Sequence, residues 1–291
     1  MSFRFFELPE RFISATLDGM VFGREDSDAL LKLERFDGWF GTPGVRADKT
    51  DRLWGHGSFT ERGLRDSRLI IAEGNARFSS EQAAVDAYYR LTSMIADGTF
   101  AQMSVVDSLF GLQTADVRLA NELSIEWLTS SIFKYQVQLF AADPRKYGQA
   151  LTASTGVSID GGGLDYPLYS PGGALSYGPA GTPGTLQLTN VGTADTPVVH
   201  TLTGDMPYGF TITELGTQRR LVYAGAVIPG QVIRLDSADG SVMLDGDNDR
   251  GSELVRRDWV RLGKGQTGTW LFEAPGSTGA LLSTEVVPAW W

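Results

Sequence analysis

The sequence predicts a mainly β protein with one clear α-helix, divided into two parts of different character. After residue 184, short segments with alternating apolar residues recur about every ten residues, which is typical of strands. Only one stretch, near residues 80–97, repeats apolar residues with the period of a helix. Glycine is unevenly distributed, with 11 in the first 145 residues and 24 in the remainder. These observations indicate a mixed first part and an all-β second part.

The length of 291 residues allows about two domains of ~150 residues each. The hydrophobic share of 42% and the charged share of 21% exclude a disordered chain and a coiled coil. We expect an N-terminal domain over residues 1–150 and a C-terminal domain over residues 185–291. Residues 151–184 include many Gly, Pro, Ser and Tyr, so we expect a linker and the first loops of the second domain there.

In the first part, three segments have the pattern of strands. Residues Ile13–Phe22 alternate around Asp18-Gly19, which is a strong signal for a tight hairpin. Arg68–Ala72 and Phe133–Ala141 are also predicted strands. In the latter, every second residue is apolar, so one face is expected to be buried.

The single helix is predicted at about residues 80–97 from its end signals as well as its period. Ser79 is the expected N-cap, with Gln82 three residues later completing a capping box. Gly98 occupies the position of a C-cap glycine. The apolar positions that recur at helical spacing are Ala84, Tyr88, Leu91 and Ile95.

The second part is predicted to be a β-sandwich or jelly roll, because its alternating segments are separated by turn residues. The predicted strands are Thr185–Thr189, Val198–Leu202, Phe210–Glu214, Leu221–Tyr223, Val232–Leu235, Val242–Leu244, Trp259–Leu262, Trp270–Ala274 and Leu281–Val287.

Composition and charge exclude several classes of function. The net charge is −10, divided equally between the two parts, so the average surface repels a nucleic-acid backbone. No apolar run approaches the ~18–20 residues of a membrane span, and the N-terminus lacks the pattern of a signal peptide. The chain has no cysteine and only two histidines, His56 and His200, so we expect no metal ion and no cofactor.

Two glycine- or aspartate-rich motifs resemble ligand sites only superficially. Gly263–Gly268 matches G-x-G-x-x-G, but strand-like segments flank it on both sides, which favours a hairpin turn over a dinucleotide site. Asp245–Asp249 resembles a calcium loop, but Arg250 and Arg256 occupy the positions of its glycine and its bidentate glutamate. We expect a solvated turn there.

We find no catalytic residues and predict that the chain is not an enzyme. No G-x-S-x-G elbow is present. His200 lies in an alternating segment and His56 in a turn, so both are expected to be structural. A glycoside hydrolase with two carboxylates stays an alternative, because 35 acidic residues offer many pairs, although the sequence singles out none.

Aromatic residues are the best candidates for an interface. Trp39 and Phe40 follow a turn signal and precede Pro43, so we expect a loop that projects both rings. The chain ends in Trp290 and Trp291. Exposed tryptophans suit a protein or sugar interface, and the alternative is that these rings close a core.

Four stretches, in this order, resemble the distal tail proteins of long, flexible-tailed bacteriophages, including minor tail proteins of phages that infect actinobacteria. They are Leu33–Arg46; His56–Phe59 followed by Asp66–Ile70; Asp143–Tyr147; and Asn190–Val198 followed by Leu235-Asp236 and Gly240–Val242.

This resemblance implies an N-terminal β-sheet-plus-helix ring domain followed by a galectin-like β-sandwich. It implies a hexameric ring at the virion tail tip, assembled in the host cytoplasm, between the tail tube protein and the tail-tip hub protein. Tape measure or receptor-binding proteins are further implied partners. DNA would pass through the channel without specific binding, and no membrane insertion is implied. The alternative function is a carbohydrate-binding adhesion module that recognises host cell-wall polysaccharide.

Overall fold

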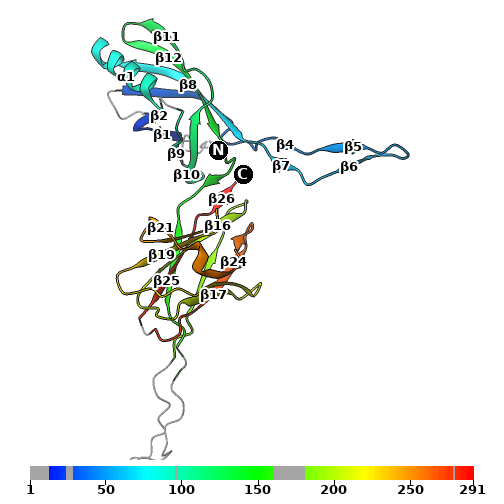
Figure 1. The fold of residues 1–291 in the computed structure, drawn as a ribbon. Helices are drawn as coiled ribbons and strands as arrows, with labels where there is room; N and C mark the ends of the chain where they lie inside the picture. The colour runs from blue at the N-terminus through cyan, green and yellow to red at the C-terminus, as the bar shows by residue number, and fades with distance from the viewer. Residues whose placement is uncertain (1–12, 24–28, 96–97, 160, 162–180, 278) are drawn as a thin grey trace, which may run out of the picture. The chain divides into compact units, whose positions relative to one another are not determined.

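The computed structural model describes residues 13–23, 29–95, 98–159, 161, 181–277 and 279–291. They form two compact units, Met1–Gly148 together with Trp291, and Gln149–Trp290 (Figure 1). The architecture is mainly β with one helix, as predicted.

The first unit is built on one large sheet with the strand order β11-β12-β8-β3-β2-β1-β9-β10-β13. A second pairing, between β10 and β12, closes this sheet on itself. Its strands are β1 (Ile13–Leu17), β2 (Met20–Phe22), β3 (Ala29–Asp37), β8 (Arg68–Phe78), β9 (Ala101–Asp107), β10 (Gly111–Leu119), β11 (Ser124–Thr129), β12 (Ile132–Ala141) and β13 (Lys146–Tyr147).

The predicted hairpin and strands of this unit are confirmed. β1 and β2 pair around Asp18 and Gly19, whose φ angles of 47° and 72° are those of a tight hairpin turn. β8 and β12 contain both predicted strands and pair with each other along their length. Their alternate side chains are buried, which explains the period-2 pattern.

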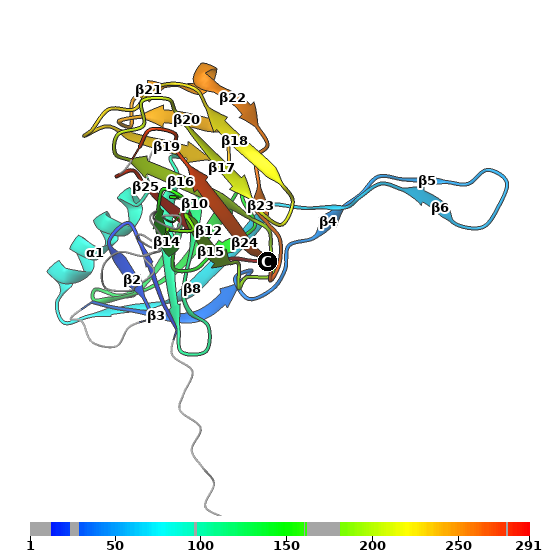
Figure 2. The same ribbon diagram turned by 90° about the horizontal axis from the view of Figure 1, so that it is seen from below.

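Helix α1 (Glu81–Ser93) packs on β8 and β3 through Ala84, Ala87 and Leu91, which are buried (Figures 1 and 2). Both predicted end signals were wrong. The N-cap is Ser80 and not Ser79, because the Ser80 hydroxyl accepts a hydrogen bond from the amide of Ala83 at 3.2 Å. The helix ends at Met94, well before Gly98, because Met94 and Ile95 turn inward and are buried.

Between β3 and β8 the chain leaves the sheet as a narrow two-stranded arm. Its strands are β4 (Val45–Arg46), β5 (Lys49–Asp51), β6 (Ser58–Thr60) and β7 (Leu64–Arg65), with β4 pairing β7 and β5 pairing β6. In both views the arm leads away from the sheet that carries it (Figures 1 and 2). The arm is absent from the strands predicted above, because nothing in its sequence alternates as a half-buried strand does.

The second unit contains two sheets, as a β-sandwich requires. One has the order β14-β25-β16-β19-β20-β21, and the other β15-β24-β17-β18-β22. The elements are β14 (Leu151–Gly156), β15 (Thr185–Thr189), β16 (Thr196–Thr203), β17 (Phe210–Glu214), β18 (Arg219–Tyr223), β19 (Val232–Asp236), β20 (Ser241–Leu244), β21 (Asn248–Asp249), η1 (Gly251–Glu253), β22 (Leu254–Arg257), β23 (Arg261–Leu262), β24 (Thr267–Glu273), β25 (Leu281–Val286) and β26 (Ala289–Trp290).

Apolar side chains from both sheets share one core, and Trp270 and Phe272 of β24 are among its largest members. The strands predicted in this part are present, except that Trp259–Leu262 shortens to β23. Residues 151–156, expected in a linker, form β14 and pair with β25, because their alternate side chains are half-buried. Most of the expected linker, 160 and 162–180, lies outside the described residues.

The two motifs of this unit that resemble a dinucleotide site and a calcium loop both contain turns. Gly263–Gly268 connects β23, which pairs β16, to β24, which pairs β15 and β17, so it passes between sheets and is not the expected hairpin. Of Asp245–Asp249, the first three residues form the turn between β20 and β21, and the last two are β21 itself. In the turn, Asp245 accepts a hydrogen bond from the amide of Val232 at 2.8 Å.

Candidate functional site

The root of the arm is the loop that leaves β3 after Asp37, and one buried side chain holds it. Arg68, at the start of β8, is 1% exposed. Its Nη1 donates to the carbonyls of Gly38, Trp39 (3.1 Å) and Gly41 (2.8 Å). Its Nε donates to the carbonyl of Pro144 at 2.9 Å. A fork of donors on a rigid plane therefore fixes the path by which the chain enters the arm.

A second buried cation lies beside the first. The ammonium of Lys146 in β13 is 5.5 Å from the centre of the Trp39 ring, and Lys146 is 6% exposed. Burial, and then the charge of Arg68, lowers the pKa of Lys146 to about 8. Burial, and then the charge of Arg65, lowers the pKa of Arg68 to about 10. Both groups are still cations at neutral pH.

Other predicted interface residues lie around the same loop. Phe40, 37% exposed, has its ring 6.2 Å from those of Phe36 and Phe110. The carbonyl of Pro43 accepts a hydrogen bond from Arg65 at 3.1 Å, and the Arg65 guanidinium lies 5.2 Å from the Trp291 ring.

The loop does not project Trp39 as expected, because the ring is only 1% exposed. The half-buried Trp290 belongs to β26 of the second unit, so the terminal pair is divided between the two units.

The segment that carries Lys146 has a carboxylate of its own, and that carboxylate is engaged. Asp143 binds the Arg145 guanidinium at 2.8 Å and the Tyr147 hydroxyl at 2.6 Å. Burial alone would raise the pKa of Asp143, but the hydrogen bonds from Arg145 and Tyr147 outweigh it, so this pKa lies below its usual value. Asp143 therefore stabilises its own turn.

Parts of three of the four stretches that carried the family resemblance, Leu33–Arg46, Asp66–Ile70 and Asp143–Tyr147, thus meet at the root of the arm, whereas His56–Phe59 lies in the arm itself. Sequence reasoning singled out the aromatic residues of these stretches and missed Arg68 and Lys146, which organise them. A usable signal was present for Arg68, which stands at the beginning of the apolar segment Leu69–Ala72, where a solvated cation has no obvious place. Lys146 lies between Arg145 and Tyr147, and no such pattern marks it.

The arm itself exposes apolar side chains to an unusual degree. Leu53 is 91% exposed, Trp54 98% and Phe59 65%. The Arg52 guanidinium over the Phe59 ring, at 4.9 Å, is a modest local contact. A two-stranded ribbon without a packed face is marginal in water, so these side chains are suited to burial against another surface.

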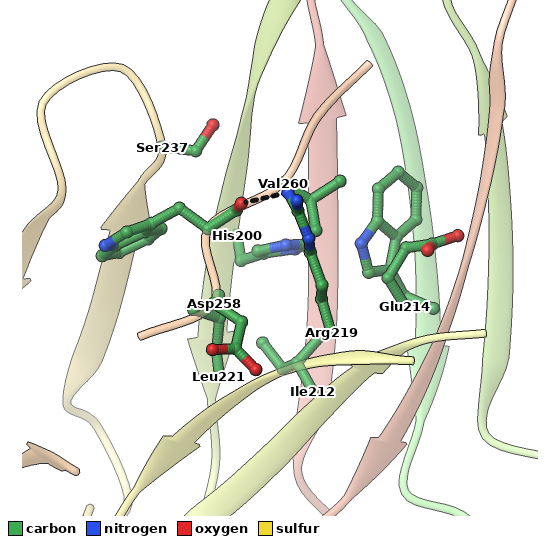
Figure 3. Close-up of a pocket in the computed structure, with 10 residues that line it drawn as sticks. His200, Ile212, Glu214, Arg219, Leu221, Ser237, Asp258 and Val260 are labelled. Carbon is green, nitrogen blue, oxygen red and sulfur yellow. Dashed lines mark hydrogen bonds between the residues drawn. The ribbon is translucent and has the colours of Figure 1, made fainter. Parts of the chain in front are cut away.

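The second unit has a small pocket, partly open to solvent, between its two sheets. His200, Glu214, Arg219, Asp258 and Trp270 contribute to its lining (Figure 3). Here Arg219 donates to the Trp259 carbonyl at 3.2 Å, the contact drawn as a dashed line.

The polar groups of this pocket are engaged within the chain. Glu214 accepts from the amides of Gly216 and Thr217 at 3.0 and 2.6 Å. His200 pairs with Thr284 at 2.8 Å, and burial lowers the pKa of His200 to about 3, so the ring is neutral at pH 7. The pocket therefore adds no argument for sugar binding or acid–base chemistry.

Among the described residues, no three His, Asp or Glu side chains gather as a metal ion would require. The one described helix, α1, has 13 residues and is too short to cross a membrane.

Comparisons with known proteins show which fold this is. No protein-family model and no curated protein matches the chain. Among solved structures, it is similar to the crystal structure of the Dit protein (gp 19.1) of phage SPP1, described as a paradigm of the hub adsorption apparatus of phages that infect Gram-positive bacteria. The identity is 13%, the TM-score is 0.63, and the match covers 96% of this chain and 99% of that one.

The chain is also similar to a component of the phage P2 baseplate in its activated conformation, solved with Ca and with Sr. The TM-score is 0.51 in both cases, with 11% and 12% identity, and the match covers 94% of this chain and 97% of each of those chains. Over nearly its whole length, the chain therefore has the fold of these proteins.

Proposed function

We propose that this chain is a structural protein of the phage tail tip, a distal tail protein that forms a ring. The observation that carries the proposal is the fold match to the SPP1 Dit protein over 96% of this chain, which includes both units. Fold alone does not determine function. The arm is the second support, since it gives the chain a surface suited to assembly.

The arm explains how identical copies would join. It presents Leu53, Trp54 and Phe59 far from the core of its own unit, so a second copy is a natural acceptor. A contact between an arm on one copy and a different surface on the next is heterologous, and such contacts form a ring when the rotation from copy to copy closes. A hexamer is the ring size that the family resemblance implies.

In the virion, the ring would lie between the tail tube protein and the tail-tip hub protein, near tape measure or receptor-binding proteins. Its channel would pass DNA without specific binding. The chain's net charge of −10 suits such a channel, because acidic walls repel the phosphate backbone. The likeness to actinobacterial phage proteins rests on the sequence stretches alone. The role is mechanical and needs no enzyme site.

The test is the mass and shape of the full chain in solution, by sedimentation and negative-stain imaging. We expect rings, or a concentration-dependent shift to a closed oligomer. Changing Leu53 and Trp54 together to Ser should abolish it. The matched control is Tyr208→Ser, which removes an aromatic ring that is 75% exposed on the second unit. A wild-type chain that stays monomeric at high concentration, with no ring on any template of tube or hub protein, would refute the proposal.

A further inference from the structure

The arm's root contains two buried cations that no carboxylate of the described residues neutralises. Arg68 and Lys146 are 1% and 6% exposed. Arg68 makes its hydrogen bonds to carbonyl oxygens, and Lys146 faces the Trp39 ring. The charged groups that act on them are cations, Arg65 on Arg68 and Arg68 on Lys146. Burying like charges together is costly unless an anion joins them.

One atom of this pair also lacks a partner. The Nη2 of Arg68 is buried and has no acceptor, and it is the one such side-chain atom among the described residues. A buried charged donor without an acceptor lowers the free energy of unfolding, so each such atom in a native structure needs an explanation. Asp143, on the segment that carries Lys146, does not provide it, because it binds Arg145 and Tyr147.

From this geometry we propose that Arg68 and Lys146 form a receptor for one carboxylate group, supplied by a second copy of this chain. The carboxylate would accept from Arg68 Nη2 and from Lys146 Nζ, which satisfies the unpaired donor and neutralises the buried charge. The choice of a second copy rests on the proposed ring.

Two further observations favour that source. The chain has 35 acidic and 25 basic residues, so its surface offers carboxylates in excess. The receptor also lies at the root of the arm, where Arg68 donates hydrogen bonds to the carbonyls of the loop. In a closed ring, every copy would donate one carboxylate and receive one.

The pH profile of lysine acetylation tests this receptor directly. The chain has five lysines (Lys32, Lys49, Lys134, Lys146 and Lys264), so peptide mass spectrometry can follow each one. The midpoint of each profile gives the pKa of that amine, whereas its amplitude reports accessibility. We expect a Lys146 midpoint near 8 in the dilute chain and a clearly higher midpoint in the assembled ring, with the profile of Lys264 followed as the internal control.

A Lys146 midpoint that stays low in the ring would overturn the receptor. If no ring forms, the proposed function fails. The receptor is then tested alone, by comparing the Lys146 midpoint of the dilute chain in sodium acetate with its midpoint in sodium chloride. A higher Lys146 midpoint in acetate would support the receptor but contradict the second copy as the source of its carboxylate. An equal midpoint in the two salts would overturn the receptor as well as its proposed source. As a second measurement, Lys146→Met should weaken assembly about tenfold, and Lys264→Met should leave it unchanged.

Discussion

The two units differ in whether their buried polar side chains have hydrogen-bond partners and counter-ions. In the second unit, Asn190 is fully buried and completely satisfied, since its Nδ2 donates to the carbonyls of Ala194, Leu262 and Gly263 and its Oδ1 accepts from the amide of Gly192. In the first unit, Arg68 keeps a buried donor without an acceptor, and Lys146 has no counter-ion among the described residues.

The surfaces of the two units also differ, in how far apolar side chains extend into solvent. The first unit extends an arm whose tip residues Leu53 and Trp54 are more than nine-tenths exposed, whereas the second closes its two sheets over a continuous core. We interpret the first unit as incomplete by itself, which is what the proposed assembly requires. Four changes to single residues test this interpretation.

The largest effect is expected from Arg68→Met. The change removes the donor group from four buried or half-buried carbonyls at the arm's root, and we expect the first unit to lose about 4 kcal/mol of stability. Hydrogen exchange of the full chain in denaturant assigns the loss to one unit. The matched control is Arg77→Met on the same strand, since Arg77 is exposed; an equal loss there would show that Arg68 is no special anchor.

Gly38→Ala should cost somewhat less, about 3 kcal/mol. Gly38 has a φ of +79°, and an added Cβ would lie 1.9 Å from the backbone oxygen of Leu69, so the loop must move. Gly41→Ala in the same loop is the control, because nothing lies within 4 Å of its Cβ position and its φ is not positive. Chemical denaturation of both variants checks this, and equal stabilities would contradict the tight approach at Gly38.

In the second unit, acid should act through His200. Its pKa is about 3 when folded and 6.5 when unfolded, so the unfolded chain binds the proton first and stability falls as pH drops from 6.5 towards 3. At pH 4.5 this contributes a loss of about 2 kcal/mol. His200→Asn should lack this contribution, so its stability should fall less than that of the wild type between pH 7 and 4.5. Parallel acid profiles for the two proteins would show that His200 does not titrate this way.

The smallest effect, and opposite in sign, is expected from Lys146→Met in the unassembled chain. The pKa of Lys146 is lowered from 10.5 to about 8, so the charged form is disfavoured by folding at neutral pH. The variant should be about 1–2 kcal/mol more stable than the wild type at pH 7. The gain should shrink as pH rises from 8 to 10.5, where the wild-type lysine becomes neutral in both states. A loss of stability at pH 7 would mean that Lys146 is already compensated.

Local pattern predicted much of the fold. The second unit is predictable because each strand buries one face, so the predicted bounds of Thr185–Thr189 and Phe210–Glu214 agree with those of β15 and β17. The helix was predicted in place but not in its ends, since Ser79 and Ser80 are both capping residues and only three-dimensional geometry chooses between them.

Neither the arm nor the arrangement at its root could be predicted from local sequence pattern. The strands of the arm have no buried face in this chain, so no alternation marks them. Trp39 and Pro43 were singled out by residue type, and their positions at the root confirm the turn but leave an interface role as a prediction. Arg68 and Lys146 are distant in sequence, and only the closed sheet brings both to Trp39.

We expect assembly to complete the first unit and to leave the second unit unchanged. Hydrogen exchange by mass spectrometry, on the dilute chain and on the assembled oligomer, tests this most directly. We predict new protection in the arm, Val45–Arg65, and in the turn from Asp143 to Tyr147, with exchange in β16, β19 and β25 unchanged. Protection gained chiefly in the second unit, with the arm still exchanging freely in the oligomer, would contradict the account.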